Sequence, residues 1–190
     1  VAGSVTNAGT ATDFTLARYL ATGALDTSFG TAGRVTVAPT AASESGFDVL
    51  AQPDGKILAA GNTLSAAGGL DALVVRLSAT GAPDTTFNGT GSRAIAFPAG
   101  WTNAFASARA RARLADGRIV VAALDLSNGV AGVVRLNADG TLDGSFAGGG
   151  PAFLRSGANG FHIGLALDGA GRAVLAHAES SSTFGNTDFA

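Results

Sequence analysis

Three arginines alternate with alanines at Arg109, Arg111 and Arg113. Alternate side chains of a β-strand lie on one face, so this spacing predicts three cations on one face of a strand. Three guanidinium groups that lost water together would require anionic partners. One hypothesis is a solvated face or a charged edge that resists aggregation. A second is a contact with an anion, such as phosphate or an acidic glycan. A third is a one-residue bulge, which would move the stripe to the other face.

The two histidines, His162 and His177, lie on neighbouring predicted strands of one hairpin, with Glu179 nearby. A two-residue turn at Ala170 and Gly171 would pair His162 with Glu179 and place all three side chains on one face. A four-residue turn would set the two histidines opposite each other. Two imidazoles and a carboxylate can hold a divalent metal, so these three residues form a candidate metal site. The alternative is ordinary cross-strand packing.

Residues 137–143 resemble the oxygen-rich opening of a calcium loop, but the closing glutamate is missing, and a simple Asp-Gly turn is the alternative. The sequence contains no nucleophile elbow, phosphate loop, zinc-protease helix or dinucleotide fingerprint. We therefore assign no catalytic residue and expect no cofactor.

An Arg, a Gly, an Asp and a Phe recur at fixed spacing in three segments, which begin 58 and 59 residues apart. Such an Asp can accept backbone N–H groups in a local turn. We expect the Phe to fill the core and the Arg to reach the Asp in a partly buried pair. A second interpretation makes the three aspartates repeated ligands. The members are Arg18, Gly23, Asp26 and Phe29; Arg76, Gly81, Asp84 and Phe87; Arg135, Gly140, Asp143 and Phe146.

Composition favours an all-β protein. The 190 residues are 46% hydrophobic and 14% charged, with Glu present twice and Lys once, so residues typical of helix surfaces are nearly absent. The net charge of −2 gives no general attraction to nucleic acid or to an anionic membrane. No apolar run approaches the ~20 residues of a membrane span. The absence of Cys excludes disulfides and thiolate metal sites.

Four short strands per period, with Asp-Gly turns at Gly55 and Gly117, predict tandem four-stranded antiparallel blades, a partial β-propeller. The units are approximately 13–61, 71–124 and 132–178, with part-units at 1–3 and 188–190. Three and a third blades do not close a ring. We therefore expect a slice of a longer array, or a ring that closes by self-association.

The segments that begin at Asp54 and Asp116, read with the three Arg-to-Phe segments, resemble the delta-60 repeat family of bacteria. A weaker copy begins at Gly171. The resemblance implies β-propeller blades and a large exported or surface protein, hence an extracellular or cell-surface location. It implies no particular chemistry.

These observations predict a non-enzymatic binding or structural module of a larger exported or surface protein, whose blades present loops to a protein or glycan partner. One alternative is an enzyme with its active site at the propeller axis. Another is a repeat scaffold whose units pack against further blades or against copies of the same chain.

Overall fold

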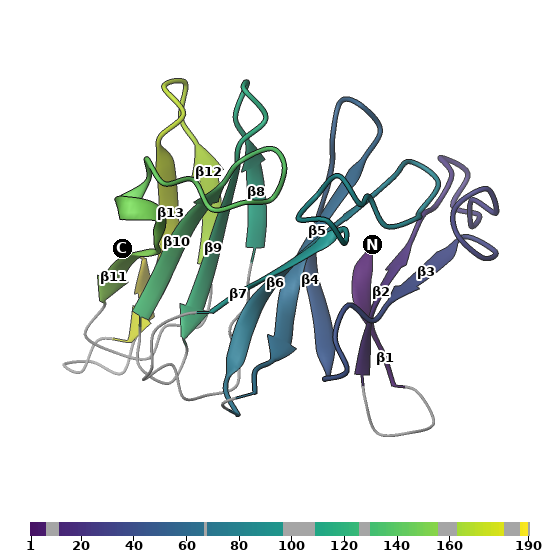
Figure 1. The fold of residues 1–190 in the computed structure, drawn as a ribbon, viewed down its shortest axis with the longest axis horizontal. Coiled ribbons are helices and arrows are strands. Elements are labelled where there is room, and N and C mark those ends of the chain that lie inside the picture. The colour runs from purple at the N-terminus through teal and green to yellow at the C-terminus, as the bar shows by residue number, and fades with distance from the viewer. Residues whose placement is uncertain are drawn as a thin grey trace.

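The computed structural model describes residues 1–6, 12–66, 68–96, 109–125, 130–155, 163–180 and 187–189. In this part of the chain, antiparallel strands form four sheets that stand in a row (Figure 1). The only helical element described is a 3₁₀ turn, η1 (Ala147–Gly149), and no described helix has the length and hydropathy to cross a bilayer. The all-β fold predicted from the sequence is confirmed.

Three or four antiparallel strands, neighbouring one another in the following order, make up each sheet. The first sheet contains β1 (Ala2–Thr6), β2 (Thr12–Ala17) and β3 (Arg34–Val37); the second contains β4 (Glu44–Ala51), β5 (Ile57–Leu64), β6 (Leu70–Leu77) and β7 (Ser92–Ile95); the third contains β11 (Ala152–Arg155), β10 (Val130–Leu136), β9 (Ile119–Asp125) and β8 (Arg109–Arg113); the fourth contains β12 (Ile163–Leu167), β13 (Ala173–Ser180) and β14 (Thr187–Phe189).

Asp-Gly turns form the hairpins β4–β5 and β8–β9, as predicted. In the first, Gly55 has a φ of 83° and donates its N–H to the Gln52 carbonyl at 2.9 Å, while the Asp54 carboxylate accepts the N–H of Lys56 at 3.2 Å. A positive φ is costly for residues with a Cβ, which is why glycine occupies this position. The tips of β4–β5, β8–β9 and β12–β13 all point to one end of the molecule, the top of Figure 1.

Neighbouring sheets pack face to face, so the second and third sheets are covered on both sides. Val120 lies in an apolar cluster with Leu165 of the fourth sheet, whereas the adjacent Val121 lies in a cluster with Leu58 of the second. This arrangement explains why several strands are apolar at successive positions. Full burial of a Val or Leu side chain contributes about 1.5–3 kcal/mol, so the stacking of sheets is a main source of stability.

Each complete sheet combines the last two strands of one sequence period with the first two of the next. The sheet from β4 to β7 takes β4 and β5 from unit 13–61 and takes β6 and β7 from unit 71–124. The sheets are therefore offset by two strands from the units drawn on the sequence. β1 also extends beyond the part-unit 1–3, to Thr6. The four described sheets do not close into a ring (Figure 1).

Candidate functional site

The repeated Arg, Asp and Phe form a compact corner, seen best in the second copy. Arg76 Nε donates to Asp84 Oδ2 at 2.7 Å, and its Nη2 donates to the Thr86 hydroxyl at 2.9 Å. The other oxygen, Asp84 Oδ1, accepts the backbone N–H and the hydroxyl of Thr86. The Arg76 guanidinium lies 4.8 Å from the centroid of the fully buried Phe87 ring. The predicted charge-assisted pair and core-filling phenylalanine are thus confirmed.

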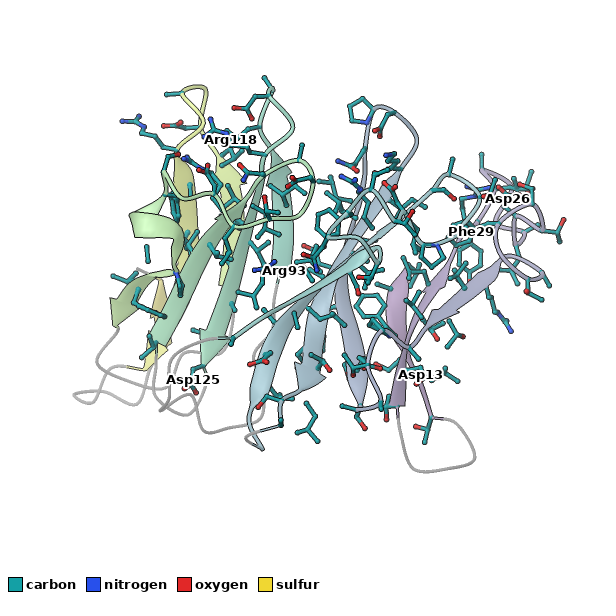
Figure 2. The ribbon with its side chains drawn as sticks, in the orientation of Figure 1. Asp13, Asp26, Phe29, Arg93, Arg118 and Asp125 are labelled. Carbon is teal, nitrogen blue, oxygen red and sulfur yellow. The ribbon has the colours of Figure 1, made fainter. Side chains whose placement is uncertain are left out.

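The other two copies repeat this geometry. The Arg-to-Asp distances are 2.8 Å for Arg18 with Asp26 and 2.6 Å for Arg135 with Asp143. Hydrogen bonds from Ser145 and from the two neighbouring arginines hold the pKa of Asp143 well below its usual range. The corner aspartates are therefore ionised, with donors of the chain itself on both oxygens. Figure 2 shows the Asp26–Phe29 corner, near the same end of the molecule as the hairpin tips.

The corner also binds the next sheet. Arg76 Nη1 donates to the carbonyl of Ala138, and the N–H of Asn88 donates to the carbonyl of Asp139 at 2.6 Å. The turn glycine beside them, Gly140, packs directly against the Phe87 ring. We call this arrangement the interblade clasp. The first corner makes the same contacts one unit earlier, with Ala79, Thr80 and Gly81 as partners of Arg18, Gly30 and Phe29.

A groove of about 360 Å³ lies between the second clasp and the hairpin tips. Gln52, Asp54 and Lys56 line it from the β4–β5 tip, and Asp139 lines it from the loop after β10. Lys56 Nζ lies 2.7 Å from Asp84 Oδ2. Burial raises the pKa of Asp84, but hydrogen bonds from Lys56 and Thr86 and the charge of Arg76 outweigh it, so this pKa lies well below its usual range.

Gln52 is the unusual residue of the groove. It is 7% exposed, and its side-chain Oε1 is buried without a hydrogen-bond partner in the described part of the chain. A buried acceptor that lacks a donor costs about 1–3 kcal/mol. The aligned position of the next hairpin is Leu114, so the repeat itself does not require a polar group here. Sequence analysis missed Gln52, and this departure from the repeat was the signal that marks it.

The arginine stripe forms β8, and its pairing with β9 is irregular. Arg109 pairs with Ala122 and Arg113 pairs with Ile119, with a register shift between them at Arg111. The predicted one-residue bulge is therefore present. Because the partners are an odd number of residues apart, register positions 109 and 113 fall on opposite faces of the sheet. The three side chains lie outside the described part, so an anion contact stays a prediction.

The hairpin β12–β13 closes with a three-residue turn. The Asp168 carboxylate accepts the backbone N–H groups of Ala170 and Arg172, each at 2.9 Å, and this brace fixes the turn length. The resulting register pairs His177 with Ile163. Neither of the two turn lengths considered from the sequence is correct, because the Asp168 side chain selects a third.

The predicted metal site falls largely outside the described side chains. His162 lies outside the described residues, and only the backbone of His177 and Glu179 is described, in β13. Among described residues, no three His, Asp or Glu side chains are grouped so that they could hold a metal. In the calcium-like loop, Asp139 Oδ1 accepts the N–H and the hydroxyl of Thr141, as in an ordinary Asp-Gly turn.

Comparison with known proteins agrees with this architecture. Searches of curated proteins and of solved structures gave no match. A family model described as "Domain of unknown function (DUF5122) beta-propeller" matches residues 1–29, 52–87 and 114–146, slightly more than half of the chain. Each matched segment ends on the phenylalanine of a corner. The chain therefore belongs to this DUF5122 β-propeller family.

Proposed function

We propose that the chain is a non-enzymatic binding module that holds a glycan in the groove between the second and third sheets. The observation that carries the proposal is the unpartnered Gln52 Oε1, which is buried and lines this groove. A sugar hydroxyl that donates to this oxygen would remove the cost of burying it unpaired.

The remaining lining suits the same ligand class. Lys56 and Thr86 carry hydrogen-bond donors, and Asp54 and Asp139 carry acceptors, all on one groove. Sugar hydroxyls both donate and accept, so a mixed set of this kind matches them. Glycans are therefore favoured over apolar ligands.

A binding role is also supported by what already occupies the groove's charged groups. Asp84 contacts both Arg76 and Lys56, and Asp139 is engaged by Thr141. A general acid or base must exchange protons near neutral pH, but the pKa of each of these two aspartates is lowered, Asp139 by the hydrogen bonds from Thr141. The groove thus favours a binding module over an enzyme at the propeller axis.

The wider setting belongs to the same proposal. The resemblance of the Asp54 and Asp116 segments to delta-60 repeats supports a module of a larger exported or cell-surface bacterial protein. At such a surface the groove would meet extracellular glycans.

A glycan array tests this function. Wild type should bind a subset of glycans; Gln52→Leu and Lys56→Ala should each weaken that binding about tenfold, the effect of losing about 1.4 kcal/mol. Leu is the aligned residue of the next hairpin, so Gln52→Leu should fold. Arg172→Ala is the matched control, because Arg172 aligns with Lys56 but pairs only with Asp168 in its own turn. No glycan bound by wild type, or equal binding by Gln52→Leu, would overturn the proposal.

The same array examines the arginine stripe if it includes acidic glycans. The triple variant Arg109→Ala, Arg111→Ala, Arg113→Ala should lose selectively any acidic glycan that the stripe binds. An unchanged profile would remove the stripe from the binding surface.

A further inference from the structure

Half of an interblade clasp stands open in the first unit. Its turn residues Ala21, Thr22 and Gly23 align with the residues that receive the two complete clasps. Gly23 has the φ of +85° found at Gly140, yet a Cβ placed on Gly23 would meet nothing within 4 Å. All three turn residues are exposed. This unit therefore presents a receiving surface without a described occupant.

An apolar side chain is exposed beside this turn. Tyr19 is 52% exposed, whereas the residues aligned with it, Leu77 and Leu136, are fully buried. Leu77 shares a cluster with Phe29 of the preceding corner, and Leu136 shares one with Phe87. Tyr19 thus occupies a position that a preceding corner covers in both complete clasps.

The complementary half stands open in the third corner. Arg18 and Arg76 each donate from Nη1 to a carbonyl of the next unit, but Arg135 Nη1 has no acceptor among the described residues. Phe146 is only partly buried, in contrast to Phe29 and Phe87. The third corner is therefore a donor without a described receiver.

The backbone of this corner is already shaped for the contact. Ala147 has a φ of 47°, close to the 57° of Gly30 and the 52° of Asn88, which donate their N–H groups across the complete clasps. A left-handed conformation is unfavourable for alanine. For the Ala147 N–H, the described residues provide no acceptor. The corner thus adopts its docking conformation before it has a partner.

We infer that the third corner of one chain docks on the first turn of a second copy and forms a third clasp. Arg135 Nη1 donates to the Ala21 carbonyl, the Ala147 N–H donates to the Thr22 carbonyl, and Phe146 packs against Gly23 and Tyr19. The occupant is a second copy because the two open halves are complementary and both belong to this chain. The contact is heterologous, so it builds closed rings or open filaments.

Sedimentation equilibrium over a wide range of concentration tests this contact. Wild type should self-associate, and Gly23→Asn should weaken association about tenfold or more, because a side chain there meets the docking Phe146. Gly68→Asn is the matched control: Gly68 has a φ of +84° and equally open surroundings, but lies in the β5–β6 turn, outside the contact. Arg135→Gln should also weaken association, with its fold checked by circular dichroism.

Mixing the two blocked variants identifies the geometry. Gly23→Asn keeps an intact corner and Arg135→Gln keeps an intact turn, so a mixture should form heterodimers and nothing larger. A symmetric interface, in which both copies use the same surface, would not give this result. The inference is overturned if wild type stays monomeric, if Gly23→Asn associates as Gly68→Asn does, or if the mixture forms no heterodimer.

Discussion

A Cβ atom on Gly140 would lie 2.8 Å from Cδ2 of the Phe87 ring. This separation is below any real contact between carbon atoms, so the turn after β10 approaches the ring as closely as it does only because residue 140 is glycine. Gly140 also has a φ of +85°. The packing of the second sheet on the third therefore depends on one missing methyl group.

We expect Gly140→Ala to destabilise the fold by more than Gly68→Ala. Both variants place an alanine at nearly the same positive φ, which costs about 1–2 kcal/mol. Only Gly140→Ala also forces a methyl group into the Phe87 ring, for a further 1–3 kcal/mol, roughly, of overpacking. Urea unfolding of both variants gives the comparison. Equal losses of unfolding free energy would mean that the ring can move aside.

The second corner should be more sensitive than the first to loss of its aspartate. The side chain of Arg76 is 8% exposed and that of Arg18 is 33% exposed. Asp84→Asn leaves the buried guanidinium without its counter-charge, which costs about 3–5 kcal/mol where a buried pair is broken. Asp26→Asn should cost less, because water can reach Arg18. Thermal unfolding ranks the two variants, and the reverse order would contradict this account.

The repeat could be read from the sequence because its determinants are side chains. Arg76, Asp84 and Phe87 indicate the corner by type and spacing, and the Asp-Gly turns indicate the hairpins. The clasp could not be read, because the acceptor for Arg76 is the carbonyl of Ala138, a group that every residue carries. Nor does a period mark its own starting point, so the two-strand offset of the sheets had no signal.

The candidate site was harder to predict for a related reason. Gln52 matters because neighbouring blades bury it, and burial between sheets is a property of the assembled fold. The register of β12–β13 depends on two backbone N–H groups that the Asp168 carboxylate accepts, so counting turn residues gave the wrong pairing. The bulge at Arg111 likewise appears in the ladder and not in the alternation of residue types.

Acid should destabilise the fold through the corner aspartates. Hydrogen bonds from Ser145 lower the pKa of Asp143 in the folded chain, so its contribution to stability is complete above the pKa of the unfolded chain, about 3.9. That contribution declines as the pH falls below about 4 toward the lowered folded-state pKa. Asp143→Asn should therefore melt below wild type at pH 7, with a smaller gap at pH 3. A gap that widened in acid would contradict the assignment.

Glu44 stands at the start of β4 and is fully buried. The hydroxyls of Thr40 and Thr63 donate to its Oε1, whereas its Oε2 has no partner in the described part of the chain. Burial, and then the nearby charge of Asp13, raise the pKa of Glu44, although the Thr40 hydroxyl opposes them. Figure 2 shows Asp13 toward the end of the first sheet that lies away from Asp26.

Glu44→Gln should therefore stabilise the chain at neutral pH. The unfolded chain releases the Glu44 proton near pH 4.3, roughly, before the folded chain does, so wild type loses stability as the pH rises from there through the raised folded-state pKa. Glutamine keeps an oxygen for Thr40 and Thr63 and carries no charge, so the melting temperature at pH 7 should rise by a few degrees, about 1 kcal/mol. The gain should vanish at pH 3, where the wild-type carboxyl is protonated. Asp54→Asn, the same chemical change in an exposed turn, serves as the control and should shift the melting temperature little at either pH; a Glu44→Gln gain that persisted in acid would show that charge is not its cause.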